Sequence, residues 1–392
     1  MTEATLPYAG LRVLDMSQGL AGPYCAGLLG MQGATVIKVE PPAGDWIRSA
    51  GGGREGMTSL AIMGNPGKRS ACIDATRPEG KALLLKMAKS ADVFVQNFRP
   101  GVIERLGLSY ETLCLDHPAL VYVSVTGFGP SGPDAKKPAT DSVLQAFTGM
   151  AQLNKDSDGT PRRFPFLVPD TVTGVYAAQA VGAALFARAM TGKGRHVQVS
   201  LMEACAALQA APILDATLSD GKPAAPITVP AGMFRTRGGY ITVTSLNDTM
   251  FASLLKALGL EALGKDPRFA LTADRQRNAA FMNAEVAKCL ALQDTQHWMA
   301  QFSAADVLCA DASDYAGFRA APQAVHMKVF KEIDQYPYGR LPLPRVPGGD
   351  LDWPLEAAPR PGQHTLEILA EAGVSEAERA ALVSAGVIRQ AA

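Results

Sequence analysis

The sequence predicts an α/β fold, with a large, doubly wound domain and a second, smaller α+β domain. Two observations support this prediction. In the first half of the chain, short β-branched runs alternate with helical patterns, which is typical of a parallel sheet with helices on both faces. Beyond about residue 226 the pattern changes to a strand followed by three helices. A chain of 392 residues is also long enough for two or three structural units.

Local composition places the strands and helices of the large domain. Pro23 suits the start of the first helix, because its missing N–H is not needed there. Open sheets of this Rossmann-like kind bind ligands beyond the carboxyl ends of their strands, so a ligand is expected at that edge. The expected strands lie at 11–15, 35–39, 92–96, 121–125 and 196–200, and the expected helices at 23–31, 78–90 and 171–190.

Composition also divides the chain into three parts. A stretch rich in Pro, Ala and Gly at 214–229 is the best candidate for a linker, so residues 1–225 are expected to form the N-terminal part of the large domain. Residues 226–320 form the small domain. Residues 321–392 return to the large domain, and the prolines of 337–362 predict an extended segment there. Other expected elements are a strand at 240–244 and helices at 248–258, 274–292, 295–303, 365–372 and 375–384.

The charge balance and the cysteine pattern exclude several classes of protein. The 37 Lys and Arg residues balance 37 Asp and Glu residues, so the chain lacks the positive charge that nucleic-acid binding usually needs. Six cysteines and five histidines are scattered without metal-ligand spacing, which predicts neither a metal site nor disulfides. The chain shows no signal-peptide pattern, and its longest apolar stretch, 175–187, is too short to span a membrane. We expect a cytoplasmic protein with no nucleic-acid or membrane partner.

The N-terminal strand, turn, helix and second strand have the outline of a dinucleotide-binding unit. Gly19 and Gly22 lie in the turn, and Glu40 follows the second strand. The glycine spacing, however, is G-L-A-G-P rather than G-x-G-x-x-G, and Pro23 replaces an N–H that would face a pyrophosphate. A nicotinamide or flavin cofactor is therefore disfavoured, while a nucleotide-like ligand at the strand ends stays open.

Two further segments have both a structural and a functional interpretation. Asp170 stands at the start of the long helix, where it is expected to be a helix N-cap; the same position also suits an ionised, backbone-oriented carboxylate for nucleophilic attack. Asn97 and Arg105 follow the end of a strand, and Arg105 is either a solvated side chain or a partner for phosphate. The residues alone leave these alternatives open.

Several segments occur together in an order that is characteristic of one family. They are Val13–Asp15, Leu20–Pro23, Gly33–Glu40, Gly67–Ser70, Asn97–Gly101, Gly127–Gly129, Asp170 with Gly174, Thr191–Gly194 and Gly362–Thr365. With them, essentially the whole chain resembles the class III CoA-transferases, a family that also contains 2-methylacyl-CoA racemases. The resemblance implies a large α/β domain completed by the C-terminal segment, a smaller domain, and an interlocked homodimer.

The resemblance assigns the chemistry to Asp170, which matches the family's catalytic aspartate. In that family the carboxylate attacks an acyl-CoA thioester, forms a mixed anhydride, and then carries CoA as an aspartyl thioester before an incoming acid reverses the sequence. Coenzyme A is then a cosubstrate and a small carboxylic acid is the other substrate. The resemblance implies no permanently bound cofactor and no metal.

The resemblance also implies a set of residues that bind CoA. Lys38 is included because two positions that are basic in some members are Pro41 and Thr76 here. Arg48 and Arg77 are alternatives to it. The residues expected to bind CoA are Gln18, Leu20, Lys38, Asn97, Arg105 and Thr140.

One departure bears on the reaction type. The racemase branch has a G-H-D triplet about thirty residues before its aspartate, whereas this chain has Ala139-Thr140-Asp141. Thr140 cannot exchange a proton at neutral pH, and His117 is poorly placed to substitute for the missing histidine. CoA transfer is therefore the expected activity, and acyl-CoA racemisation is the alternative.

Arg162 and Arg163 shortly precede Asp170. Either of them could hold the distal carboxylate of a dicarboxylic acid, or both could be solvated loop residues. The sequence leaves this choice and the identity of the exchanged acids open.

Overall fold

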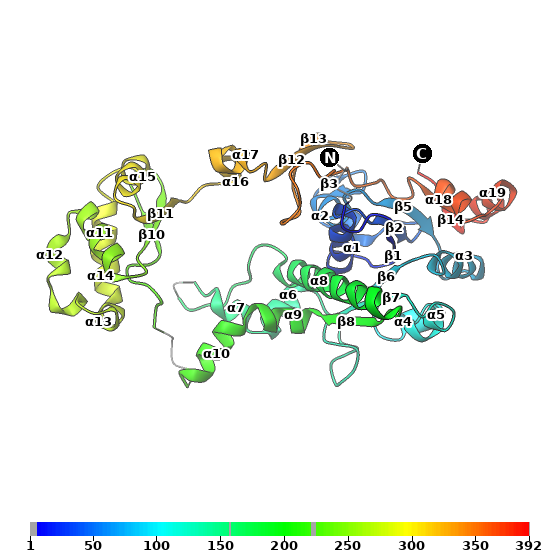
Figure 1. Ribbon diagram of the computed structural model, residues 1–392, viewed down its shortest axis with the longest axis horizontal. Helices are drawn as coiled ribbons and strands as arrows, with labels where there is room; N and C mark the ends of the chain where they lie inside the picture. Colours follow the sequence, from blue (N-terminus) through cyan, green and yellow to red (C-terminus); the bar gives the residue numbers. More distant parts are fainter. Residues whose placement is uncertain (1–5, 157, 221–224, 392) are drawn as a thin grey trace. The chain divides into compact units, whose positions relative to one another are not determined.

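The computed structural model describes residues 6–156, 158–220 and 225–391, which form two compact units (Figure 1). The first unit comprises Met1–Ala210 and His326–Ala392, and the second comprises Ala211–Val325. The small domain expected at 226–320 falls within the second unit. Each unit has a hydrophobic core of its own.

The first unit is built on a seven-stranded sheet with the order β14-β5-β2-β1-β6-β7-β8. Neighbouring strands pair in parallel, except that β14 pairs antiparallel with β5 at one edge. The strand order reverses at β1, because the chain adds β2 and β5 on one side and then returns with β6 on the other. The doubly wound α/β fold predicted from the sequence is confirmed. The strands are β1 (Arg12–Asp15), β2 (Thr35–Glu40), β5 (Arg69–Ile73), β6 (Val93–Gln96), β7 (Val121–Thr126), β8 (His196–Ser200) and β14 (Ile388–Arg389).

The helices of the first unit follow the expected order with shifted ends. The long helix expected at 171–190 begins three residues earlier, because Val168 and Pro169 form part of its first turn, where proline is tolerated. The helices are α1 (Ala21–Met31), α2 (Ser59–Gly64), α3 (Pro78–Ala88), α4 (Val102–Arg105), α5 (Tyr110–Asp116), α6 (Asp141–Phe147), α7 (Met150–Leu153), α8 (Val168–Thr191), α9 (Leu201–Leu208), α18 (Thr365–Glu371) and α19 (Glu376–Ser384), with a 3₁₀ turn η1 (Trp46–Ser49).

Helices cover both faces of the sheet. Successive residues of each strand point to opposite faces, so each strand contributes side chains to two cores. Val13 and Val93 belong to the core that the sheet forms with α1 and α8. Their neighbours Leu14 and Phe94 belong to the core on the other face, with α3, α5 and α18 (Figure 1). Gly174 lets α8 approach α1 closely, since a Cβ there would lie 2.9 Å from the carbonyl oxygen of Ala21. This contact holds the start of α8 against the turn that follows β1.

Several paired strands of the first unit were not expected from the sequence. The strand β5 contains Ser70, Ala71 and Cys72, a composition that gives little strand signal although the strand is buried in the sheet. Part of the proline-rich return segment, expected to be extended, forms an antiparallel hairpin. The additional paired strands are β3 (Gly53–Arg54) with β4 (Met57–Thr58), and β12 (Phe330–Gln335) with β13 (Gly339–Pro344).

The second unit has a three-stranded antiparallel sheet with the order β11-β10-β9. The helix expected at 274–292 is two helices, because the backbone of Asn278 (φ −108°, ψ 21°) leaves helical geometry between them. The elements are β9 (Met233–Arg235), β10 (Tyr240–Thr244), β11 (Leu308–Asp311), α10 (Ala210–Leu218), α11 (Asp248–Leu258), α12 (Glu261–Gly264), η2 (Pro267–Phe269), α13 (Thr272–Arg277), α14 (Ala279–Leu290), α15 (Thr295–Ala304), α16 (Tyr315–Ala320) and α17 (Pro322–His326).

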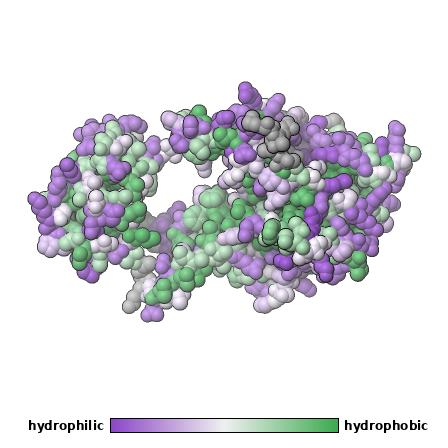
Figure 2. Space-filling view, viewed as in Figure 1, coloured by the Kyte–Doolittle hydropathy of each residue, from purple (hydrophilic) through white to green (hydrophobic). Residues whose placement is uncertain are grey.

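Large apolar side chains are exposed on several helices, among them α8 and α10. Phe186 and Met190 are exposed on α8, and Ile213, Leu214 and Leu218 on α10. Figure 2 shows apolar surface around α10. Within the described part of the chain, no single helix is long and apolar enough to cross a membrane, although α9 and α10, bent by 64° at their junction, reach that length and composition as a pair.

Candidate active site

A cavity of about 540 Å³ opens beyond the carboxyl ends of β1 and β6, where the strand order of the sheet reverses. Open α/β sheets bind ligands at this position, because the loops that follow the two strands diverge there. Five of the residues proposed as catalytic or CoA-binding line this cavity. They are Gln18, Leu20, Asn97, Thr140 and Asp170.

Asp170 lies in the first turn of α8, but it is not the helix N-cap. The N-cap is Leu167, and no side chain caps this helix, so the capping interpretation of Asp170 is wrong. The backbone N–H of Asp170 donates to the carboxylate of Asp141 (3.2 Å). Among the described residues, none forms a hydrogen bond or an ion pair with the Asp170 carboxylate, which therefore stands free at the cavity wall.

The environment of Asp170 changes its acidity. Burial, together with the smaller effect of the negative charge of Asp141, raises the pKa of Asp170 to about 7. The sequence led us to expect an ionised carboxylate held by the helix N-terminus, but that expectation left out burial. A carboxylate with this pKa is more basic than an ordinary aspartate and is ionised in a large fraction of molecules at neutral pH.

Asp141 fixes the start of α8 relative to α6. Its side chain is buried and accepts hydrogen bonds from the Asp170 N–H and from Gln145 Nε2 (2.7 Å). Gln145 in turn accepts a hydrogen bond from the backbone of Phe164 (2.8 Å), so one buried amide links α6 to the segment before α8. Burial also raises the pKa of Asp141. Neither Asp141 nor Gln145 was predicted from the sequence as a site residue. The only signal for Asp141 was its place in the triplet that departs from the racemase pattern.

Asn97 shapes the turn that follows β1. Its side-chain amide accepts a hydrogen bond from Gln18 N (2.8 Å) and donates to Gln18 O (2.6 Å), as a neighbouring strand would do. Gly19, which follows Gln18 in this turn, has a φ of +77°, and a Cβ there would lie 2.7 Å from the Trp46 ring. The loop after β6 therefore holds the turn after β1 in one conformation beside the cavity.

Lys38 lies beneath this turn rather than in the cavity. Its side chain is fully buried, and its ammonium donates to Asp45 (3.1 Å) and to the carbonyl of Ser17. The Asp45 carboxylate accepts a hydrogen bond from Gly19 N (3.1 Å). Lys38 thus holds the turn in place through hydrogen bonds from inside the fold. Its buried ammonium has no access to a ligand bound in the cavity.

Arg105 is the other proposed residue that the structure does not bring to the cavity. It is exposed at the end of α4, and its guanidinium donates to Gly101 O (2.8 Å). Arg99 and Arg163 are the cations that line the cavity within the described chain. The alternatives Arg48 and Arg77 do not line it, and Arg48 is paired with Glu40.

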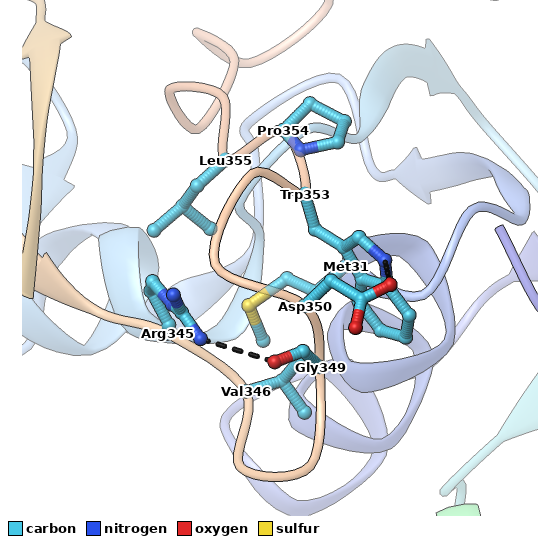
Figure 3. A pocket seen from close by; sticks show the side chains of 8 residues that line it. All are labelled: Met31, Arg345, Val346, Gly349, Asp350, Trp353, Pro354 and Leu355. Atoms are coloured by element: carbon cyan, nitrogen blue, oxygen red, sulfur yellow. Dashed lines mark hydrogen bonds between the residues drawn. The ribbon is translucent and has the colours of Figure 1, made fainter. Parts of the chain in front are cut away.

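A second cavity lies against the return segment, where residues 345–355 pass over Met31 at the end of α1 (Figure 3). Its volume of about 10 Å³ is enough for one water molecule. Arg345 donates to Gly349 O (3.1 Å), while its buried Nη1 has no partner among the described residues. This space is too small for a substrate. Across 6–156, 158–220 and 225–391, no cluster of three side chains suited to a metal ion is found.

Comparison with known proteins decides the family. Residues 8–365 match the pattern of CoA-transferase family III. The chain belongs to this family. It is 33% identical to the acetyl-CoA:oxalate CoA-transferase of Acetobacter aceti, over 82% of this chain and 86% of that protein. It is 31% identical to the human succinyl-CoA:glutarate CoA-transferase, over 98% of this chain and 90% of that protein.

The architecture agrees with this assignment. A crystal structure of a CaiB/BaiF family protein from Brucella suis superposes with a TM-score of 0.83 at 31% sequence identity, over 94% of this chain and all of that one. The resemblance inferred from the sequence is thereby confirmed at the level of family and fold. Family III membership makes this chain a CoA-transferase that uses CoA as a cosubstrate.

Proposed function

We propose that this CoA-transferase moves CoA from an acyl-CoA thioester to a carboxylic acid through covalent intermediates on Asp170. The supporting observation is a carboxylate of raised pKa, without a partner among the described residues, in the wall of the cavity at the strand-order reversal. A carboxylate nucleophile suits this exchange, because an anhydride and a thioester have similar reactivity and no ATP is then needed.

The first half of the reaction removes the donor acid. An oxygen of ionised Asp170 attacks the thioester carbonyl carbon, the C–S bond breaks, and CoA leaves as a thiolate while a mixed anhydride forms. The thiolate then attacks Cγ of Asp170, the anhydride C–O bond breaks, and the donor leaves as a carboxylate. Asp170 now carries CoA as a thioester, and no proton has been gained or lost.

The second half is the same sequence in reverse. The acceptor carboxylate attacks Cγ of Asp170, which releases the thiolate and forms a second anhydride. Attack of the thiolate on the acceptor carbonyl carbon then breaks the C–O bond to Asp170, giving the new acyl-CoA and the free aspartate. Arg99 lines the cavity beside Asn97 and is placed to bind a phosphate of CoA, a role expected from the sequence for Arg105 and Lys38.

Racemisation stays the weaker alternative. A racemase needs a second acid–base group across the α-carbon, and no histidine is present among the described residues that line the cavity. Thr140 occupies the position of the expected histidine and lines the wall. The two named relatives exchange CoA with oxalate and glutarate, which are carboxylic acids, and this also favours transfer.

A single incubation separates transfer from racemisation. The protein is mixed with an acyl-CoA in D₂O, with and without a second carboxylic acid, and the products are analysed by mass spectrometry. Transfer predicts a new acyl-CoA that forms only when the second acid is present, without deuterium at the α-carbon. Deuterium incorporation without a second acid would contradict the proposal.

The pH dependence of the first half-reaction follows from the environment of Asp170. Because attack requires the ionised form, kcat/KM for the acyl-CoA should rise with pH through about 7 and level off above it. Asp141 interacts with Asp170, so the titration belongs to the pair rather than to one residue. Steady-state rates between about pH 5 and 9 measure this profile. A profile that is flat down to pH 5 would contradict the raised pKa.

We also propose that the chain acts as a homodimer, as the resemblance implies. The supporting observation is that α10 has no buried residue and exposes Ile213, Leu214 and Leu218, because an exposed apolar patch marks an interaction site. Light scattering should then give twice the chain mass of 41.2 kDa. A particle with the mass of one chain would contradict this proposal.

A further inference from the structure

Resting on the transfer reaction proposed above, we propose that Arg163 binds the non-reacting carboxylate of a dicarboxylic acid, which makes diacids the preferred substrate class of this enzyme. The observation behind this inference is the different environment of two adjacent arginines. Arg163 lines the cavity that contains Asp170, whereas Arg162 does not. The guanidinium of Arg162 is instead paired with Asp156, outside the cavity lining.

Three hydrogen bonds hold the backbone around Arg163. Arg162 N donates to Ala151 O (3.2 Å), Arg163 O accepts from Asn154 Nδ2 (3.3 Å), and Phe164 N donates to Gln145 Oε1 (2.8 Å). The side chain of Arg163 is exposed and forms no hydrogen bond or ion pair with the described residues. A fixed backbone and a free guanidinium are suited to binding an anion that enters the cavity.

Gln145 connects this arginine to the reacting carboxylate. The same buried amide that holds Phe164 donates to Asp141, whose other oxygen accepts the N–H of Asp170. Asp141 and Gln145 of α6 therefore hold both the segment with Arg163 and the start of α8 by hydrogen bonds. The positive charge of Arg163 also interacts with Asp141. It acts to lower the pKa of Asp141, whereas burial has the larger, opposite effect.

The cavity contains a cation that can bind the second carboxylate of a diacid. Its charged lining consists of Arg99, Asp141, Arg163 and Asp170. During the reaction one carboxylate of the diacid becomes an anhydride and then a thioester, and so loses its charge. The second carboxylate stays ionised throughout, so a guanidinium can hold it in every intermediate. Arg163 suits this role because hydrogen bonds through Gln145 and Asp141 link its segment to Asp170, whereas Arg99 lies two residues after Asn97, which binds the turn that follows β1.

The competing explanation is that Arg163 acts only on the charges of Asp141 and Asp170, whatever the acid. Pairs of acceptors that differ in one charge separate the two explanations. Each diacid from oxalate to adipate is compared with its monoamide, which has nearly the same shape but lacks the second carboxylate. The measured quantity is kcat/KM for the acceptor in the wild type and in Arg163→Ala, Arg163→Lys and Arg162→Ala.

We expect Arg163→Ala to lower kcat/KM about 100-fold for the preferred diacid and less than about threefold for its monoamide. Arg163→Lys should recover part of this loss, because it keeps the charge but not the two-pronged geometry. Arg162→Ala, the matched control, should change neither acceptor more than about threefold. Equal losses for diacid and monoamide, or no loss for either, would overturn the inference. The inference about Arg163 would also be overturned if the wild type used monocarboxylic acids but no diacid, although the proposed CoA transfer would then still hold. If the wild type transferred CoA to no acid at all, the proposed function itself would be overturned.

Discussion

Replacing Asp170 by alanine or asparagine should lower the rate of CoA transfer by about 10⁴-fold or more. Both variants remove the oxygen nucleophile, and no other described carboxylate in the cavity is free to replace it, because Asp141 accepts hydrogen bonds from Asp170 N and Gln145. The measurement is the rate of new acyl-CoA formation at saturating donor and acceptor. Asp156→Asn, which removes a carboxylate outside the cavity lining, is the control and should keep nearly full activity.

The loss should not come from unfolding. The folded-state pKa of Asp170, about 7, lies above its ordinary value of 3.8, so its ionisation favours the unfolded chain, and this cost grows as pH rises through that interval. Asp170→Asn removes the cost and should therefore stabilise the protein at about pH 8, by roughly 1–4 kcal/mol. An inactive Asp170→Asn variant that melts below the wild type at this pH would point to a structural role for Asp170. An Asp170→Ala variant that keeps more than about a tenth of the activity would contradict covalent catalysis there.

Replacing Asp15 by asparagine should lower the free energy of unfolding by about 3–5 kcal/mol. Asp15, Lys38 and Lys68 are all buried beside the turn that follows β1, and Lys68 donates to Asp15 (2.7 Å). Burial already lowers the pKa of Lys68 to about 8, even though Asp15 acts to raise it. Without Asp15, the ammonium of Lys68 would lose its only ion pair among the described residues. Urea unfolding followed by circular dichroism measures the effect.

A double variant distinguishes the loss of charge pairing from a loss of packing. Asp15→Asn combined with Lys68→Met removes both members of the buried pair, so no uncompensated charge remains at this position. Lys38 keeps its pair with Asp45 in this variant. We expect the double variant to recover at least half of the lost free energy of unfolding. A single variant within about 1 kcal/mol of the wild type would show that Asp15 does not compensate the buried lysines.

The sheet could be predicted where local signals are strong. The runs around Val13, Val36 and Val123 are β-branched and buried in the sheet, and they predicted its parallel pairing correctly. The strand β5 was not predicted, because a run of small residues such as Ser70 and Ala71 becomes a strand only through its two neighbours in the sheet. The antiparallel hairpin in the proline-rich return segment was missed for a related reason, since prolines at a sheet edge still allow pairing.

The site could be predicted only in part. The sequence placed Asp170 at the start of a helix and the resemblance gave it a role, but neither could show the raised pKa, which depends on burial and on Asp141. Lys38 was expected to meet the ligand, because a sequence does not show that its ammonium is used by Ser17 and Asp45 inside the fold. The separation of Arg162 from Arg163 depends on loop geometry and has no signal in the sequence.

If Asp170 becomes covalently bound to CoA, mass spectrometry of the quenched enzyme should detect the bound CoA. Wild-type protein is mixed with an acyl-CoA without acceptor, quenched in acid and digested with trypsin, which should release the peptide of residues 164–188. We predict an adduct on this peptide with the mass of CoA less one water, located at Asp170 and absent from Asp170→Asn. Turnover of the wild type without this adduct, or an adduct on a different residue, would contradict the account.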